Sequence, residues 1–387
     1  MIYDFLLFEN NRYAINHCKD VEIIARLLQA QDYSVAILNV GSEDTLCIDH
    51  SITHVSVSKK LHLLNERNRS GFLSHIFNII NMFIWHFHLR RSLIEVKDMY
   101  KQLYVGSYTN KMGLAWMSAI NNNSNAFFWG LRSFWLSEYK RNPYSFEGLN
   151  SYVLSKYFYR HKNLKFFVSN ELIKKEFEII GYGDDRTVVR EERVANIIGV
   201  IHDHKGKIPM FLSIGTLRPD KRIETCIKEF NKLSKKYEVQ YVIAGNSSSN
   251  YEATITREIF DTNAIIRKNY RIPEDEYTRL FEDADFLLLC DVQQKSSVTN
   301  GTMNEALLNG IPIIAPNYDP YEYYVNKYGV GLLFDPNEEG DMARVMEQAV
   351  MLGKDYFNNN ILNYQETLSF KSVSQKLKCD IEKLLIY

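Results

Sequence analysis

A polar loop, a short helix and an apolar strand follow one another from Ser296 to Asn317, SSVTNGTMNEALLNGIPIIAPN. Four small or polar residues lie at the expected start of this helix: Thr299, Asn300, Gly301 and Thr302. Backbone N–H groups and the positive dipole end of a helix attract phosphate at such a point. Glu305 lies about one turn inside the helix, where its carboxylate could reach the sugar hydroxyls of a nucleotide. The alternative is an ordinary α/β loop, with Glu305 merely favourable to the helix dipole.

A second candidate segment, from Phe211 to Phe230, has an apolar strand, a turn with two cations and an amphipathic helix. The strand ends at Gly215, followed by Thr216, and glycine lets a backbone pass close to a ligand. Arg218 and Lys221 could hold a diphosphate by charge-assisted hydrogen bonds. The alternative is that both are ordinary solvated charges. Because the dipole disfavours cations at a helix start, their presence there favours a functional role.

Further strands and helices alternate between these two segments, and this part of the chain resembles a known domain. The matching segments are GTLRPDK, IAGN at 243–246, IPEDEYTRLFEDADFLLL, and EALLNGIPIIAP from Glu305 to Pro316. Residues 208–350 resemble the donor domain of GT-B glycosyltransferases, and most closely glycosyltransferase family 4. The resemblance implies an α/β, GT-B fold: two Rossmann-like domains whose parallel sheets face each other across a cleft.

The resemblance also implies a nucleotide-sugar donor, UDP- or GDP-linked, and a hexosyltransferase-like reaction. The diphosphate would be bound by Arg218, Lys221 and the N–H groups of residues 299–302, which stabilise the charge that develops on the leaving group. Glu305 would bind the ribose. The remaining donor contacts would come from Gly215, Thr216, Gly245 and Asn246 and, beside the base, from Tyr270, Arg271 and Ile272. The resemblance implies retention of anomeric configuration, no metal and no other cofactor.

Two departures from family 4 bear on activity. The family's Glu-x7-Glu pair has Ser297 in place of its first Glu, and the family's Gly-Arg-Leu turn is Gly215-Thr216-Leu217 here. Some relatives have a Thr-Ser-Gly turn before the helix, which Thr299-Asn300-Gly301 resembles. A non-catalytic GT-B subunit that binds glycan or stabilises a partner transferase is therefore the alternative function. An epimerase-like enzyme on the same fold would need acidic groups on both sides of the sugar, and the sequence identifies none.

An inverting enzyme would need a general base, and His17 is the N-terminal candidate. It follows the loop after the first expected strand, although a lone histidine at a helix start is more often structural. Asp20 is a weaker candidate. Three arginines are expected to line the cleft or to be solvated or ion-paired: Arg132, Arg190 and Arg193.

The expected domains are an acceptor-binding Rossmann-like domain over 1–205, a donor domain over 206–368 and a terminal helix over 369–387. The first domain opens as a βαβ unit, with strands at 3–8 and 33–40 and a helix at 17–29. Later strands are expected at 102–107, 126–130 and 164–169, in a parallel sheet covered on both faces. The polar HDHKGK turn is the expected linker. By the resemblance, the terminal helix crosses back to the first domain.

Composition is that of a globular protein, with 45% hydrophobic and 24% charged residues in 387. Five scattered cysteines form no zinc motif and favour a reducing compartment. The N-terminus has a short apolar run but no basic segment or cleavage site, so we expect a cytoplasmic protein.

Charge is unevenly distributed, because residues 51–165 hold 16 Lys and Arg but only 5 Asp and Glu. This predicts an anionic partner: a bilayer surface, a lipid-diphosphate acceptor or nucleic acid. Nucleic acid is rejected since it leaves the donor motifs unexplained. Polar residues interrupt the apolar segment Gly71 to Ser92, so it predicts an amphipathic helix rather than a membrane span. Arg90 and Arg91 favour attachment to the inner face of the membrane, and core packing is the alternative. We therefore expect a glycan or lipid-linked acceptor, in the biosynthesis of a bacterial surface polysaccharide or glycoconjugate.

Overall fold

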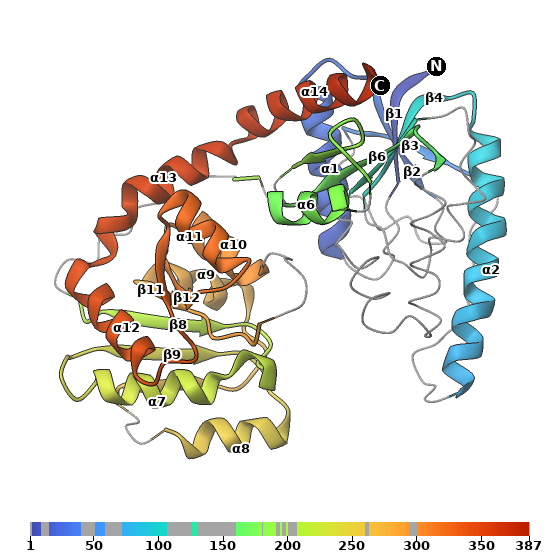
Figure 1. The fold of residues 1–387 in the computed structure, drawn as a ribbon. Coiled ribbons are helices and arrows are strands. Elements are labelled where there is room, and N and C mark those ends of the chain that lie inside the picture. Colours follow the sequence, from blue (N-terminus) through green and yellow to red (C-terminus); the bar gives the residue numbers. More distant parts are fainter. Residues whose placement is uncertain are drawn as a thin grey trace. The chain divides into compact units, whose positions relative to one another are not determined.

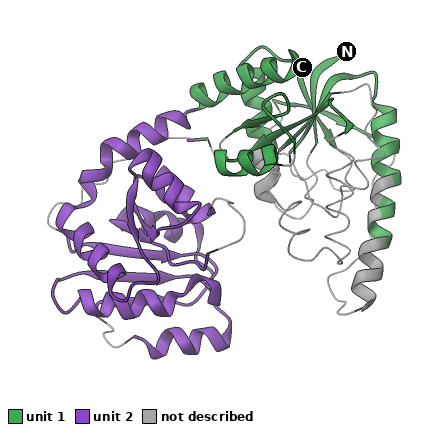
Figure 2. Ribbon diagram, in the orientation of Figure 1, with its two compact units in different colours: residues 1–194, 370–387 green, residues 195–369 purple. Residues whose placement is uncertain are grey.

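The computed structural model describes residues 2–8, 15–39, 51–58, 72–106, 125–129, 160–179, 181–190, 194–195, 199, 207–259, 263–293 and 300–386. The chain divides into two compact units, residues 1–194 with 370–387 and residues 195–369 (Figure 2). Sequence analysis placed this division later, near residue 205. Backbone pairing explains the difference, because Ala195 forms a β-bridge with Ser369 and donates its N–H to the carbonyl of Leu368 over 2.8 Å. Of the expected linker, residues 202–207, all but residue 207 lie outside the described residues.

The first unit is built on a parallel sheet (Figure 1). The order of its described strands is β3-β2-β1-β4-β5-β6-β7. Its strands are β1 (Tyr3–Phe8), β2 (Val35–Asn39), β3 (Thr53–Ser56), β4 (Tyr100–Val105), β5 (Asn125–Trp129), β6 (Leu164–Val168) and β7 (Thr187–Val189). Its described helices are α1 (Ile15–Gln29), α2 (Phe72–Glu95), α6 (Glu171–Ile179) and α14 (Phe370–Ile386). Along β1, Phe5 and Leu7 face one hydrophobic core, whereas Leu6 and Phe8 face the other. An unbroken apolar run such as FLLF, residues 5–8 of β1, is typical of a sheet covered on both faces.

The C-terminal helix, α14, belongs to the first unit and packs against α1. The Ser374 hydroxyl accepts a hydrogen bond from Gln31 Nε2 at 2.7 Å and lies 3.1 Å from the Leu27 carbonyl, to which it donates. Leu377 and Ile381 are buried in the same core as α1. Contacts more than 340 residues apart in the sequence therefore close this unit.

Helix α2 covers part of the first sheet with one face only. Leu89 and Leu93 are buried in the core, whereas Phe83 and Phe87 on the opposite face are exposed. Among the helices of the described residues, none is both long and apolar enough to span a bilayer. The amphipathic prediction for this segment agrees with the division of α2 into a buried and an exposed face.

The second unit is built on a parallel sheet with the described order β10-β9-β8-β11-β12-β13. Its strands are β8 (Met210–Ile214), β9 (Gln240–Ala244), β10 (Ile265–Lys268), β11 (Phe286–Leu288), β12 (Ile313–Pro316) and β13 (Gly331–Phe334). The α-helices among its described residues are α7 (Ile223–Leu233), α8 (Ser249–Arg257), α9 (Glu274–Asp283), α10 (Gly301–Leu308), α11 (Tyr321–Tyr328), α12 (Asp341–Leu352) and α13 (Asn358–Thr367), and the same residues include the 3₁₀ turns η1 (Pro219–Lys221) and η2 (Lys354–Phe357). Phe211 stacks on Phe286 with ring centroids 5.5 Å apart and meets Phe230 edge-on at 5.9 Å. This aromatic cluster fixes β8, β11 and α7 to one another.

Candidate functional site

The order of the second sheet reverses between β8 and β11. The chain runs from β8 outward through β9 and β10, then returns to continue from β11 through β12 and β13 on the other side. In parallel α/β sheets, ligands bind beside the carboxyl ends of the strands at such a switch point. A backbone hydrogen bond of 2.7 Å from Val292 N–H to the Asp220 carbonyl joins the loops that follow these two strands. The segment with Arg218 and Lys221 therefore lies next to the segment that leads into α10.

Glycine is required where β8 and β9 end. Gly215 and Gly245 have φ angles of 116° and 125°, which side chains rarely adopt. A Cβ atom on Gly245 would lie 1.8 Å from the carbonyl oxygen of Gly215, so Gly245 serves the close approach of the two backbones. A Cβ on Gly215 would lie 3.7 Å from Thr302 Oγ1, which places Gly215 opposite the first turn of α10. Asn246 accepts the Leu217 N–H at its carbonyl over 2.8 Å.

Lys221 is held at the switch point by a buried carboxylate. Its ammonium lies 2.9 Å from Asp291 Oδ1 and 3.1 Å from Oδ2. The Lys221 side chain is 21% exposed and that of Asp291 is 5% exposed. The alternative of an ordinary solvated lysine is therefore wrong. Sequence analysis missed Asp291, because it lies in the loop after β11, outside both motifs.

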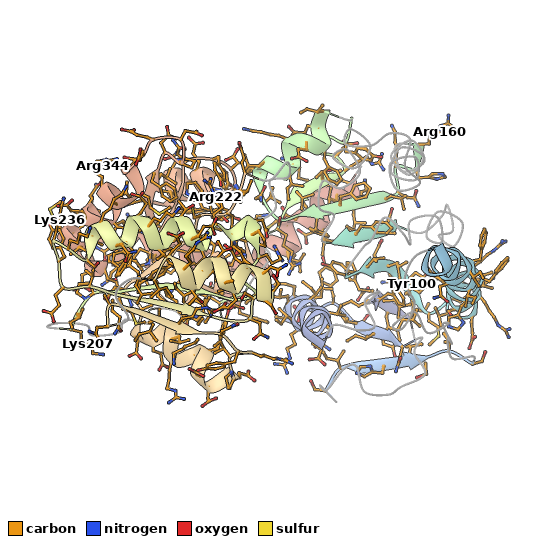
Figure 3. All side chains as sticks on the ribbon, turned by 90° about the horizontal axis from the view of Figure 1, so that it is seen from below. Tyr100, Arg160, Lys207, Arg222, Lys236 and Arg344 are labelled. Carbon is orange, nitrogen blue, oxygen red and sulfur yellow. The ribbon has the colours of Figure 1, made fainter. Side chains whose placement is uncertain are left out.

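Arg218 has a different environment. Its guanidinium forms two hydrogen bonds with Asp220, from Nε at 3.0 Å and from Nη2 at 2.9 Å. The Arg218 side chain is 56% exposed. The hydrogen bond from Arg218 is the main cause of the lowered pKa of the Asp220 carboxyl. Arg222, which follows η1 at the start of α7 (Figure 3), has a left-handed backbone with φ 49°.

The N-terminus of α10 is capped by Asn300. Its side-chain oxygen accepts the Thr302 N–H at 2.9 Å, so this N–H is already bonded in the structure. Its amide nitrogen donates to Asp291 Oδ2 at 2.7 Å and lies 3.0 Å from the Tyr321 hydroxyl. The residues around Lys221 and the first turn of α10 thus meet through one carboxylate. Thr299 and Ser297 lie outside the described residues.

Glu305 accepts a hydrogen bond from the Tyr277 hydroxyl of α9. This contact gives the carboxylate a specific position, beyond the favourable interaction with the helix dipole. Tyr277 packs against Phe281 with ring centroids 5.0 Å apart, which orients its ring. Sequence analysis did not identify Tyr277, although it lies within IPEDEYTRL, one of the segments that carry the resemblance.

The predicted base-binding segment follows β10. The Tyr270 hydroxyl donates to Glu276 at 2.7 Å, and Lys268 donates to the same Glu276 oxygen at 2.9 Å. Arg271 is exposed and Ile272 packs against the hydrophobic core. Thr216 is exposed beside Gly215. These residues share the carboxyl edge of the sheet with Gly215 and Gly245.

The candidates of the first unit give less information. The side chains of His17 and Asp20, and all of Arg132 and Arg193, lie outside the described residues. Arg190 is buried, and its Nη1 donates to the Tyr104 hydroxyl over 3.3 Å. The alternative that Arg190 is a solvated charge is therefore wrong, because its side chain is buried.

Comparison with known proteins finds a family match within the second unit. Residues 195–360 match the family described as glycosyl transferases group 1. No curated protein sequence matches the chain.

Solved structures resemble the chain over nearly its full length. The Anabaena protein HepE in complex with UDP has a TM-score of 0.66 and 14% identity, with 98% of this chain and 100% of that chain covered. Sucrose-phosphate synthase from Thermosynechococcus elongatus has a TM-score of 0.68 and 12% identity, covering 99% of each chain. The lipopolysaccharide outer core galactosyltransferase WaaB has a TM-score of 0.66 and 14% identity, covering 98% and 99%. The likeness confirms the predicted α/β, GT-B fold class.

Proposed function

We propose that this protein is a glycosyltransferase that uses a nucleotide-sugar donor. The match of residues 195–360 to the glycosyl transferases group 1 family and the GT-B fold support this proposal. One observation carries the proposal. Lys221, Gly215 and the N-terminus of α10 meet at the switch point of the second sheet, where α/β proteins bind ligands. HepE was crystallised with UDP, which supports a uridine nucleotide as the first ligand to test.

The proposed chemistry follows from the charges at this point. Cleavage of the glycosidic bond to a diphosphate leaves negative charge on the leaving group. Lys221, Arg218 and the N-terminal dipole of α10 would stabilise that charge in the transition state. Glu305 would bind the ribose and Tyr270 to Ile272 the base. We propose that the reaction retains anomeric configuration without a protein nucleophile and needs no metal.

Acceptor and location are proposed from the first unit. Ile80, Phe83, Phe87 and Ile94 form an exposed apolar stripe along α2, with the exposed Arg90 and Arg91 beside it. Apolar and cationic side chains on one helix face suit the surface of an anionic bilayer. We propose a cytoplasmic protein that attaches to the membrane and glycosylates a glycan or lipid-linked acceptor in bacterial surface polysaccharide biosynthesis. Replacing Phe83 and Phe87 by Ser should abolish sedimentation with anionic vesicles; retained sedimentation contradicts the attachment.

Binding of nucleotides to the purified protein tests the donor site. UDP, GDP, CMP and their sugar conjugates are screened by thermal shift and calorimetry, first without and then with a divalent metal. A ligand that binds only the folded state raises its apparent stability. We expect one metal-independent UDP or GDP ligand. Binding of no nucleotide would contradict the proposal and favour the alternative that Ser297 suggests, a non-catalytic GT-B subunit.

A further inference from the structure

Four segments of the second unit converge on the carboxylate of Asp291. Asp291 itself follows β11, Lys221 comes from the turn after β8, Asn300 is the N-cap of α10 and Tyr321 begins α11. Asp291 Oδ2 accepts hydrogen bonds from Lys221 Nζ, from Asn300 Nδ2 at 2.7 Å and from the Tyr321 hydroxyl. One buried side chain therefore joins the two segments predicted to bind the donor diphosphate.

The neighbours of Asp291 keep its carboxylate in one orientation. Burial and the adjacent carboxylate raise the pKa of Tyr321, so its hydroxyl remains a hydrogen-bond donor. Among the described residues, the groups with charge or titratable protons that act on or respond to Asp291 are Lys221 and Arg218 from the turn after β8, Cys226 from α7, Tyr318 before α11 and Tyr321 at its start. A buried charge is stable only with such donors, and losing one of them leaves it undercompensated.

The ammonium of Lys221 has three N–H donors, one of which donates to Asp291 Oδ2, and its nitrogen lies 2.9 Å from Asp291 Oδ1 in an ion pair. A diphosphate that enters the site competes with Asp291 for this cation. Because Asn300 and Tyr321 also donate to Asp291 Oδ2, Asp291 would keep its place while the remaining N–H donors of Lys221 bind the ligand. The cation is thereby aimed before the ligand arrives.

We propose that Asp291 is a positioning residue, which orients Lys221 toward the donor diphosphate and is itself held by Tyr321 and Asn300. The proposal rests on the proposed function of the second unit. Asp291 touches the cation that would bind the ligand and acts on the ligand through that cation.

A double-mutant cycle with UDP as the probe, or GDP where only GDP binds, tests the route through Lys221. Asp291→Asn keeps the size of the side chain but places an amide donor beside the ammonium. We expect it to weaken nucleotide affinity about tenfold in the unmodified protein and less than about twofold in Lys221→Met. An equal loss in both backgrounds overturns the proposal and leaves the donor site standing. Failure of the unmodified protein to bind either nucleotide overturns both.

Tyr321→Phe supplies a second test that survives if Asp291→Asn does not fold. It keeps the ring and removes only the hydroxyl that donates to Asp291. Because Asp291 then loses one of the donors that hold it, Tyr321→Phe should weaken nucleotide affinity about threefold in the unmodified protein and have no effect in Lys221→Met. Tyr324→Phe, the same change three residues later on a buried face of α11, is the matched control and should leave the affinity unchanged in both backgrounds. Equal affinities of Tyr321→Phe and Tyr324→Phe, or an equal loss from Tyr321→Phe in both backgrounds, overturn the proposal.

Discussion

Two cations from the same turn, Lys221 and Arg218, are each paired with an aspartate, but the pairs differ in burial. Asp291, the partner of Lys221, is almost fully buried and receives further hydrogen bonds from Asn300 and Tyr321. Asp220, the partner of Arg218, is only two residues away in the same exposed turn. An exposed pair contributes roughly 0–1 kcal/mol and exchanges readily, whereas a buried pair is costly to break.

From this difference we expect separate roles for the two cations. Lys221 has a position that the fold determines before any ligand binds. Arg218 can leave Asp220 for a phosphate at little cost, because solvent already surrounds both groups. In a donor site, the first would determine the geometry of the diphosphate and the second would add attraction that salt can screen.

The largest expected effect is at Lys354, where a substitution measures the free-energy cost of burying a charged ammonium. Its buried ammonium donates to the Ala284 carbonyl, and burial lowers its pKa from 10.5 to about 8. Because the folded state loses this proton at a lower pH than the unfolded state does, stability should rise with pH between about 8 and 10.5. In Lys354→Met this rise should be smaller by about 3 kcal/mol, measured by urea unfolding across that range. An unchanged rise would contradict the assigned burial effect.

Removal of Lys221, the cation paired with the buried Asp291, should give the largest loss of ligand binding. We expect Lys221→Ala to weaken UDP or GDP binding about 30-fold, or about 2 kcal/mol, because it removes a charge-assisted bond. The variant should lose some stability, because Asp291 loses its cation, but should stay folded, since Asn300 and Tyr321 still donate to Asp291. Lys236→Ala is the matched control: Lys236 also pairs with a carboxylate, Glu347 at 3.2 Å, in an exposed position of the second unit (Figure 3). Calorimetry that shows equal affinities for both variants would contradict the comparison.

Glu305 extends the comparison to a half-buried anionic side chain at the same site. Glu305→Ala should weaken nucleotide binding about tenfold, because a carboxylate bond to the ribose is lost. Tyr277→Phe, which removes only the hydroxyl that orients Glu305, should have a smaller effect of about threefold. The assignment of Glu305 to the ribose predicts that neither variant changes the affinity for inorganic pyrophosphate. Unchanged nucleotide affinity in both Lys221→Ala and Glu305→Ala would remove the basis for this site.

The smallest expected effect belongs to the exposed cation. Arg218→Ala should weaken nucleotide binding about threefold at 50 mM salt, and the difference should vanish near 0.5 M salt. The loss from Lys221→Ala should persist under the same conditions, because buried pairs are screened less. Equal salt dependence of the two variants would show that burial does not separate their roles.

Sequence analysis predicted much of the fold because the strands are nearly uninterrupted apolar runs. The strand expected at residues 3–8 is β1 (Tyr3–Phe8), and the helix expected at 17–29 is α1 (Ile15–Gln29). Of the candidate site, Gly215, Lys221 and Asn300 belong to local motifs with a recognisable order. These local motifs could not predict that Gly245 packs on the Gly215 backbone, since this contact depends on the pairing of β8 with β9.

The sequence by itself determined an α/β chain with a loop, a cation-bearing turn and a helix start suited to phosphate. Only the tertiary structure decided which groups meet there. Asp291 lies 70 residues from Lys221 and 30 from Tyr321, and Tyr277 lies 28 from Glu305. The physical reason is that propensity and periodicity act over a few residues, whereas the strand order of the parallel sheet brings distant loops to one edge.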